Sequence, residues 1–158
     1  MKRSLLIGIM ALSFLTICHD VYGMSEELKS ADRYSIIEET PKQYKEINLE
    51  ITFYTGLVCE NTIHGAIDAQ ENPLIWSTIA VPRSVDLGTK FEIDLYPNQI
   101  FVARDRGNIN HIKVKPDGTY RIDIFCPRKE GETDGQYWSR VNAYGRITTK
   151  GRIIIEEE

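Results

Sequence analysis

A carboxylate interrupts an apolar strand in the stretch Arg121-Ile122-Asp123-Ile124-Phe125. The alternation predicts that Ile122 and Ile124 share one face of the strand, while Asp123 lies on the other. Aspartate is depleted from β-strands and is seldom fully buried without a partner. Asp123 is therefore either a solvent-facing strand residue or a carboxylate held in place for acid/base chemistry.

A second acidic residue follows an upstream apolar run, in Phe101-Val102-Ala103-Arg104-Asp105-Arg106-Gly107. Asp105 stands where this run breaks into a turn, and aspartate is common there for conformational reasons alone. Two strand-associated carboxylates in one small domain raise the question of acid/base catalysis without settling it.

The rest of the chain predicts a mainly β domain. Apolar residues alternate from Ile47 to Phe53, which is typical of a half-buried strand. A β-hairpin is expected around Pro116-Asp117-Gly118, because proline and glycine supply the backbone angles of a tight turn. Further short strands, separated by glycine, proline or asparagine, are predicted over residues 78–81, 90–96, 99–104, 112–115 and 120–125, and up to residue 155. This number of short strands predicts a β-barrel.

One helix is predicted between Thr133 and Gly145. Thr133 suits the N-cap, Gln136 stands at the capping-box position, and Gly145 suits the C-terminal stop. The segment between Thr55 and Trp76 is a long loop for a compact domain, which is typical of a functional or irregular segment.

The first 23 residues predict a secretory signal peptide. Lys2 and Arg3 give a basic start, and the apolar run over residues 5–17 is too short for a membrane span, which needs ~20 residues. Two alternatives stay open: an uncleaved anchor, and lipid attachment at Cys18, against which the bulky Ile17 argues.

The predicted organisation is a signal peptide over residues 1–23, a polar linker or arm over 24–45, and one domain over 46–158. Cys59 and Cys126 remain after cleavage. In an exported protein they either form a disulfide or stay separate thiols, and the sequence favours neither.

The composition excludes some classes of function. The formal net charge of −4 is the opposite of what nucleic-acid binding requires. The chain has neither a paired-cysteine motif nor an HExxH motif, so no metal and no cofactor are expected.

Three blocks of sequence, in this order and at this spacing, resemble the 3D (Asp-Asp-Asp) domain. The resemblance implies a mainly β fold, a double-psi β-barrel with one short C-terminal helix, which also forms the catalytic part of the MltA family of lytic transglycosylases. It covers about two-thirds of the chain. The blocks are Ile79-Ala80-Val81-Pro82-Arg83-Ser84-Val85-Asp86-Leu87-Gly88-Thr89-Lys90, Ala103-Arg104-Asp105-Arg106-Gly107 and Arg121-Ile122-Asp123-Ile124-Phe125.

The chain departs from the family pattern at the first name-giving aspartate. Pro82 stands where family members often carry that residue, and Asp86 is nearby but out of register. Two of the three aspartates are matched, by Asp105 and Asp123.

The resemblance implies cleavage of the MurNAc–GlcNAc bond of peptidoglycan with formation of a 1,6-anhydromuramoyl end. Asp123 matches the catalytic aspartate, and Asp105 matches the second one. Glu60, in the long loop, is a candidate for the missing third carboxylate. The expected substrate-binding residues are Tyr54, Arg104 and Arg106.

The expected partner is the glycan strand of peptidoglycan, with no nucleic acid and no stable membrane anchor after signal cleavage. The expected location is extracellular or at the cell wall, or periplasmic if the organism has an outer membrane. Two other functions stay open: a non-catalytic glycan-binding or expansin-like wall-loosening module, and a small secreted interaction protein, since fold does not imply function.

Overall fold

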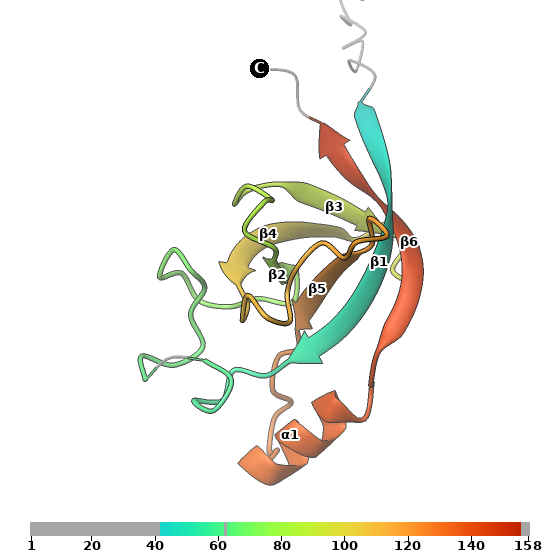
Figure 1. Cartoon of the computed structure of the whole chain (residues 1–158). Coiled ribbons are helices and arrows are strands. Elements are labelled where there is room, and N and C mark those ends of the chain that lie inside the picture. Colours follow the sequence, from blue (N-terminus) through green and yellow to red (C-terminus); the bar gives the residue numbers. More distant parts are fainter. Residues whose placement is uncertain (1–41, 62, 156–158) are drawn as a thin grey trace, which may run out of the picture. The chain divides into compact units, whose positions relative to one another are not determined.

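The computed structural model describes residues 42–61 and 63–155, which belong to one β-barrel unit (Figure 1). The predicted signal peptide, nearly all of the predicted linker and the last three residues lie outside the described residues. The first strand begins at Gln43, slightly before the predicted domain start at residue 46.

Six strands and one helix make up the described part of the chain. The prediction of a mainly β barrel with one short helix is confirmed. In chain order the elements are β1 (Gln43–Tyr54), β2 (Thr78–Val81), β3 (Lys90–Ile93), β4 (Ile100–Arg106), β5 (Tyr120–Phe125), α1 (Asp134–Asn142) and β6 (Ile147–Ile155).

The barrel closes in the order β1-β5-β2-β4-β3-β6. The pairs β1/β5 and β2/β4 are parallel, and the other four pairs are antiparallel. This pattern is unchanged when β1 is exchanged with β4, β5 with β2 and β6 with β3. The strand pairing therefore has an internal twofold symmetry, centred on the antiparallel pair β2/β5.

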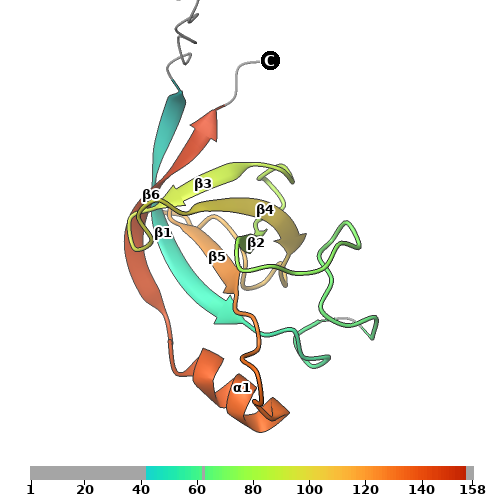
Figure 2. The ribbon, with the colours of Figure 1, turned by 180° about the vertical axis from the view of Figure 1, so that it is seen from behind.

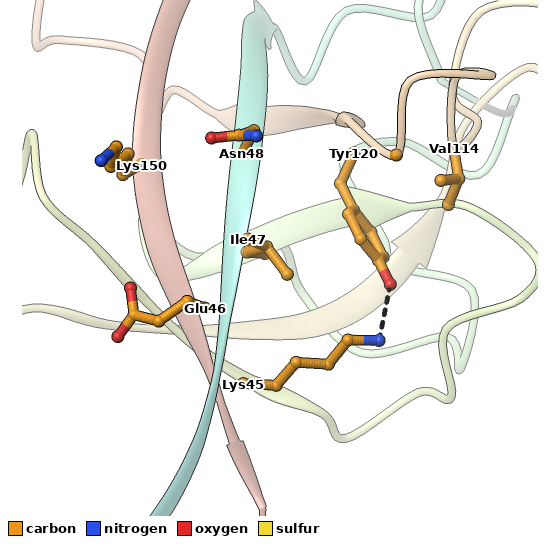
Figure 3. Close-up of a pocket in the computed structure, with 8 residues that line it drawn as sticks. Lys45, Glu46, Ile47, Asn48, Val114, Tyr120 and Lys150 are labelled. Carbon is orange, nitrogen blue, oxygen red and sulfur yellow. Dashed lines mark hydrogen bonds between the residues drawn. The ribbon is translucent and has the colours of Figure 1, made fainter.

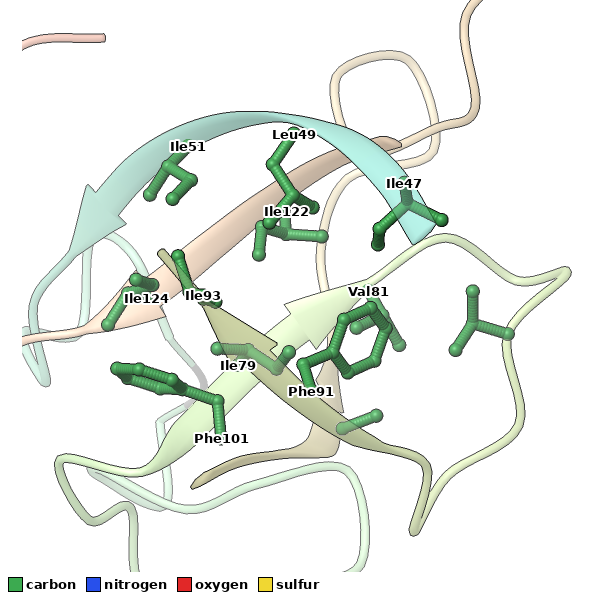
Figure 4. Packing of buried hydrophobic residues seen from close by; sticks show 12 residues of the cluster. Ile47, Leu49, Ile51, Ile79, Val81, Phe91, Ile93, Phe101, Ile122 and Ile124 are labelled. Atoms are coloured by element: carbon green, nitrogen blue, oxygen red, sulfur yellow. The ribbon is translucent and has the colours of Figure 1, made fainter. Parts of the chain in front are cut away.

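Alternate side chains of the strands fill the barrel interior (Figure 4). Ile122 and Ile124 of β5 are completely buried there, as the alternation predicts. Full burial of an aliphatic or aromatic side chain of this size contributes roughly 1.5–3 kcal/mol. Gly151 leaves room for this packing, because a Cβ atom at that position would lie 2.6 Å from the carbonyl oxygen of Glu92.

The predicted hairpin around Pro116 is much shorter than a strand pair. Val114 and Tyr120 form a single antiparallel bridge, closed by a hydrogen bond from the Lys115 N–H to the Thr119 carbonyl oxygen. The segment before it turns instead of extending, because the Ile112 N–H donates to the Asn108 carbonyl oxygen over 2.8 Å. This turn buries the side chain of Ile112 in the space that Gly107 leaves open.

The predicted N-cap of α1 is confirmed: Thr133 is the N-cap and forms a capping box with Gln136. The helix ends at Asn142 with Ala143 as its C-cap, before the predicted stop at Gly145. The helix lies beyond the C-terminal ends of β1 and β5 in both views (Figures 1 and 2). Buried Tyr137 fastens it there, since its hydroxyl donates to the Cys126 carbonyl oxygen and accepts from the Gly56 N–H over 2.9 Å. Within the described residues, no helix has both the length and the apolar character that crossing a membrane requires.

Candidate active site

Four residues form one row across the outside of the barrel. Thr52 of β1 pairs with Asp123 of β5, and Asp123 pairs in turn with Ala80 of β2. Ala80 also pairs with Asp105 of β4. The two aspartates that the sequence singled out are thus two strands apart, with only the methyl group of Ala80 between them.

A β-bulge in the pairing of β2 with β4 brings Asp105 into this row. Ile79 pairs with Ala103, but the next residue, Ala80, pairs with Asp105, so that Arg104 is the extra residue on β4. Without the extra residue, alternation would put Asp105 on the same side as buried Ala103. Bulges commonly redirect side chains in this way next to active sites.

Asp123 is an aspartate kept mostly out of water. Burial raises the pKa of its carboxyl from 3.8 to about 6. The positive charge of Arg121 opposes this rise in pKa, and the negative charge of Glu60 adds to it. The Thr52 hydroxyl donates a hydrogen bond to Oδ1 of Asp123. The group therefore titrates close to the pH range in which a general acid must hold its proton.

Asp105 is a second, separately held carboxyl group. Its Oδ2 atom accepts from the Tyr54 hydroxyl over 2.8 Å, and its Oδ1 atom accepts from the Arg106 N–H over 2.8 Å. Burial raises the pKa of Asp105, whereas these two hydrogen bonds lower it. β2 lies between the strands of Asp105 and Asp123, so two interstrand spacings, about 10 Å, separate their Cα atoms.

The two carboxyl groups open into one cavity of about 450 Å³. The wall is formed by the end of β1 and the loop that follows it, by β2 and β5, and by the segment from β4 into the next loop. Its residues are Thr52, Phe53, Tyr54, Cys59, Glu60, Asn61, Ala80, Asp105, Arg106, Gly107, Asn108 and Asp123.

Glu60 lies in this cavity with the two aspartates, as its proposed role requires. Its Oε2 atom accepts from the N–H and the hydroxyl of Thr55, so the carboxylate closes the turn that follows β1. This position lets its charge raise the pKa of Asp123 while its own oxygen is engaged by the loop.

The three expected substrate-binding residues are placed differently. Tyr54 lines the cavity, but it is buried and its hydroxyl is engaged by Asp105, so its ring is not an open stacking surface. Arg106 also lines the cavity, and its Nη1 atom donates to the carbonyl oxygens of Pro82 and Val85 over 2.6 and 2.7 Å. Arg104, the extra residue of the bulge, is not among the residues of the cavity wall.

Pro82 is buried directly after β2, where its carbonyl oxygen binds Arg106. The two cysteines are separate thiols: Cys59 is exposed at the cavity, and Cys126 is buried, which raises the pKa of its thiol to about 11.

A larger cavity of about 530 Å³ lies elsewhere on the barrel, between β1, β6 and the turn before β5 (Figure 3). Lys45 donates to the Tyr120 hydroxyl there, over 3.2 Å. This cavity contains none of the residues that line the cavity of the two aspartates.

Thr52 and Ala80 belong to the site but were not identified from the sequence. Neither carries a signal of its own, because a threonine and an alanine in strands are ordinary residues. The pairing of β1 with β5 and of β5 with β2 brings Thr52 and Ala80 into the site.

Across residues 42–61 and 63–155, no three His, Cys, Asp or Glu side chains are arranged to hold a metal ion.

Comparison with known proteins adds no family to this description: no protein-family model matches the chain, and no curated protein is found as a relative.

Proposed function

We propose that the chain is a secreted peptidoglycan lytic transglycosylase that cleaves the MurNAc–GlcNAc bond. The observation that carries the proposal is the state of Asp123: a mostly buried carboxyl with a pKa raised to about 6, opening into a cavity that also contains Asp105. A general acid needs both properties, a raised pKa and access to the bond that it protonates.

Asp123 acts twice in the proposed reaction. In its protonated form it donates the proton to the glycosidic oxygen while the bond from that oxygen to the anomeric carbon of MurNAc breaks. The C6 hydroxyl oxygen of the same sugar then attacks the anomeric carbon, and the Asp123 carboxylate accepts the hydroxyl proton. One C–O bond is broken and one is formed, no water is consumed, and Asp123 ends protonated again.

This reaction needs only one carboxyl group to carry the proton. Hydrolysis with inversion needs a second carboxylate to activate water, and hydrolysis with retention needs one as a nucleophile. An internal hydroxyl removes that requirement. Asp105, held by Tyr54 and by the Arg106 N–H, supplies negative charge toward the positive sugar ring that develops as the bond breaks.

We assign Glu60 a positioning role in this scheme. Its carboxylate is engaged by Thr55, and its charge raises the pKa of Asp123, which favours the protonated acid. Arg106 acts through the loop that it holds at Pro82 and Val85. We further propose that the barrel is of the double-psi type, which its two parallel strand pairs and twofold pairing pattern support.

Secretion and action at the cell wall are part of the same proposal and follow from the predicted signal peptide over residues 1–23. A second function, non-catalytic binding or loosening of wall glycans, is favoured by one observation: Pro82 is apolar and buried where the resembled family often has a carboxylate.

Mass spectrometry of cell-wall digests tests the choice. The wild-type chain should release 1,6-anhydro-muropeptides from purified peptidoglycan, and Asp123→Asn should lower that release by at least about 100-fold. Asp94→Asn is the matched control, because Asp94 is an exposed aspartate in a turn and does not line the cavity of the two aspartates. Wall binding by the wild type without new anhydro ends would reject the enzyme in favour of the binding module.

A further inference from the structure

Two cavities adjoin across β1. The cavity of the two aspartates and a second one of about 360 Å³ share Thr52 and Phe53. Thr52 is also the residue that donates to Asp123. The second cavity therefore begins beside the proposed acid and continues away from Asp105, along the outside of the barrel.

The far wall of the second cavity comes from the end of α1 and the turn into β6. Its residues there are Val141, Asn142, Gly145 and Arg146. Gly145 has a φ of 64°, so the chain turns sharply at this point and presents Arg146 directly after the turn. Phe53 also lines this cavity, and its ring packs against that of Tyr144 with a centroid distance of 5.1 Å.

Arg146 belongs to a cluster with surplus positive charge. Buried Glu50 of β1 is contacted by three cations, Lys115, Arg121 and Arg146. Lys115 and the Arg121 Nε atom, at 2.7 Å, already neutralise the carboxylate closely. The Arg146 Nε atom is 3.4 Å from it, and 57% of the Arg146 side chain is exposed. Arg146 is thus the outermost and most loosely held cation of the three.

Two of these cations oppose protonation of Asp123. The charges of Arg121 and Arg146 both lower the pKa of Asp123 and so disfavour its protonated form. Arg121 is needed to pair with buried Glu50, its cross-strand neighbour. Arg146 has no comparable structural need, since Glu50 keeps two closer cations without it.

We propose that Arg146 binds a carboxylate carried by the glycan, so that the second cavity is a subsite for an acidic saccharide next to the bond being cleaved. The identity of the glycan rests on the proposed function. A guanidinium matches a carboxylate with two parallel hydrogen bonds, and a partly exposed one is available to do so. Phe53 supplies an apolar surface for the sugar that carries the charge.

The experiment measures equilibrium binding by calorimetry, with the chain carrying Asp123→Asn so that ligands stay intact. Three probes are compared: a neutral GlcNAc tetrasaccharide, a peptide-free GlcNAc–MurNAc tetrasaccharide with free lactyl carboxylates, and the same tetrasaccharide with peptide stems. A second variant carries Arg146→Gln, which removes the positive charge. A third carries Arg146→Lys, which keeps a positive charge but lacks the planar guanidinium group.

Lys150→Gln is the matched control. It removes one positive charge from β6, the strand that begins directly after Arg146, but Lys150 lines the other, larger cavity (Figure 3). Thermal unfolding of each variant checks the fold, which should survive because Lys115 and Arg121 still neutralise Glu50.

Arg146→Gln should weaken binding of the acidic saccharide roughly five- to tenfold and leave binding of the neutral one unchanged. Arg146→Lys should bind the acidic saccharide with an intermediate affinity. Lys150→Gln should bind both saccharides as the unsubstituted protein does. A loss with the peptide-free probe assigns the carboxylate to the sugar, and a loss only with the peptide-bearing probe assigns it to the stem. Equal losses for neutral and acidic probes, unchanged affinities, or no binding of any acidic probe would each overturn the proposal.

The test is separate from that of the enzyme. A chain that releases no anhydro ends but binds the acidic saccharide through Arg146 would reject the transglycosylase and keep the subsite. A chain that cleaves glycan, but whose Arg146→Gln variant still distinguishes acidic from neutral saccharides equally well, would keep the transglycosylase and reject the subsite.

Discussion

The hydroxyl of Thr52 donates to Oδ1 of Asp123, and the two residues are direct neighbours on the parallel strands β1 and β5. This parallel pairing joins the first strand of the barrel to the fifth, which lie far apart in the sequence. The hydrogen bond therefore depends on the barrel fold, and it acts on a carboxyl group whose pKa burial raises to about 6.

Thr52→Val should raise the pKa of Asp123 further. A hydrogen bond donated to a carboxylate favours its ionised form, so removing the donor favours the protonated form. The pH profile of kcat/KM should move upward by roughly half a unit to one unit. Thr52→Ser, which keeps a hydroxyl, should restore the wild-type profile; identical profiles for Val and Ser would show that the hydroxyl does not tune the acid.

Glycan cleavage by the wild type should decline as the pH rises above about 6. Asp123 must be protonated to act, and its pKa is raised from 3.8 to about 6 by burial. A plot of log kcat/KM against pH should fall with a slope of about −1 above that value. A rate that stays level between pH 5 and 8 would contradict the assignment of Asp123 as the acid.

Asp123→Asn should stabilise the folded chain at neutral pH. Because the pKa is higher in the folded chain than its ordinary value of 3.8, the folded chain binds the proton more tightly than the unfolded chain. The resulting stabilisation is complete below pH 3.8 and is lost as the pH rises through about 6. An uncharged asparagine avoids that loss, on the order of 1–2 kcal/mol after allowance for solvent.

Thermal unfolding at pH 7.5 and at pH 3.5 measures this effect. The Tm of Asp123→Asn should exceed that of the wild type at the higher pH and approach it at the lower one. Asp94→Asn, on the surface, should show no such pH-dependent gain. A variant that is less stable at both pH values would mean that Asp123 contributes to the fold mainly through its hydrogen bond.

Ala80→Leu should close the space between the two carboxyl groups. Ala80 is 3% exposed, lines the cavity, and is the neighbour of both Asp105 and Asp123 across the strands. We expect binding of the GlcNAc tetrasaccharide to weaken about tenfold or more, with an overpacking cost of about 1–3 kcal/mol in stability. Ala80→Ser is the control for a small polar change. Unaltered binding by Ala80→Leu would place the ligand elsewhere on the barrel.

Local features of the chain could be predicted because they depend on neighbours in sequence. The bounds of β2 agree with the expected strand over residues 78–81, and the Thr133 capping box of α1 is confirmed. The predicted strand at 112–115 is limited to one bridge at Val114, because the preceding segment turns back to pack Ile112 against Gly107. That packing is a tertiary contact, and the alternation of apolar and polar residues along the chain does not reveal it.

The sequence by itself determined the strands over residues 78–81 and 120–125, the apolar face of the latter, and that Asp123 and Asp105 are unusual in their surroundings. Only the tertiary structure decided that they belong to one site. Pairing of β5 with β2, and the bulge on β4, put the two carboxyl groups in one row with Thr52 and Ala80. Alternation gives a side chain its face but not its neighbour, because register is set by contacts between strands that are far apart in the chain.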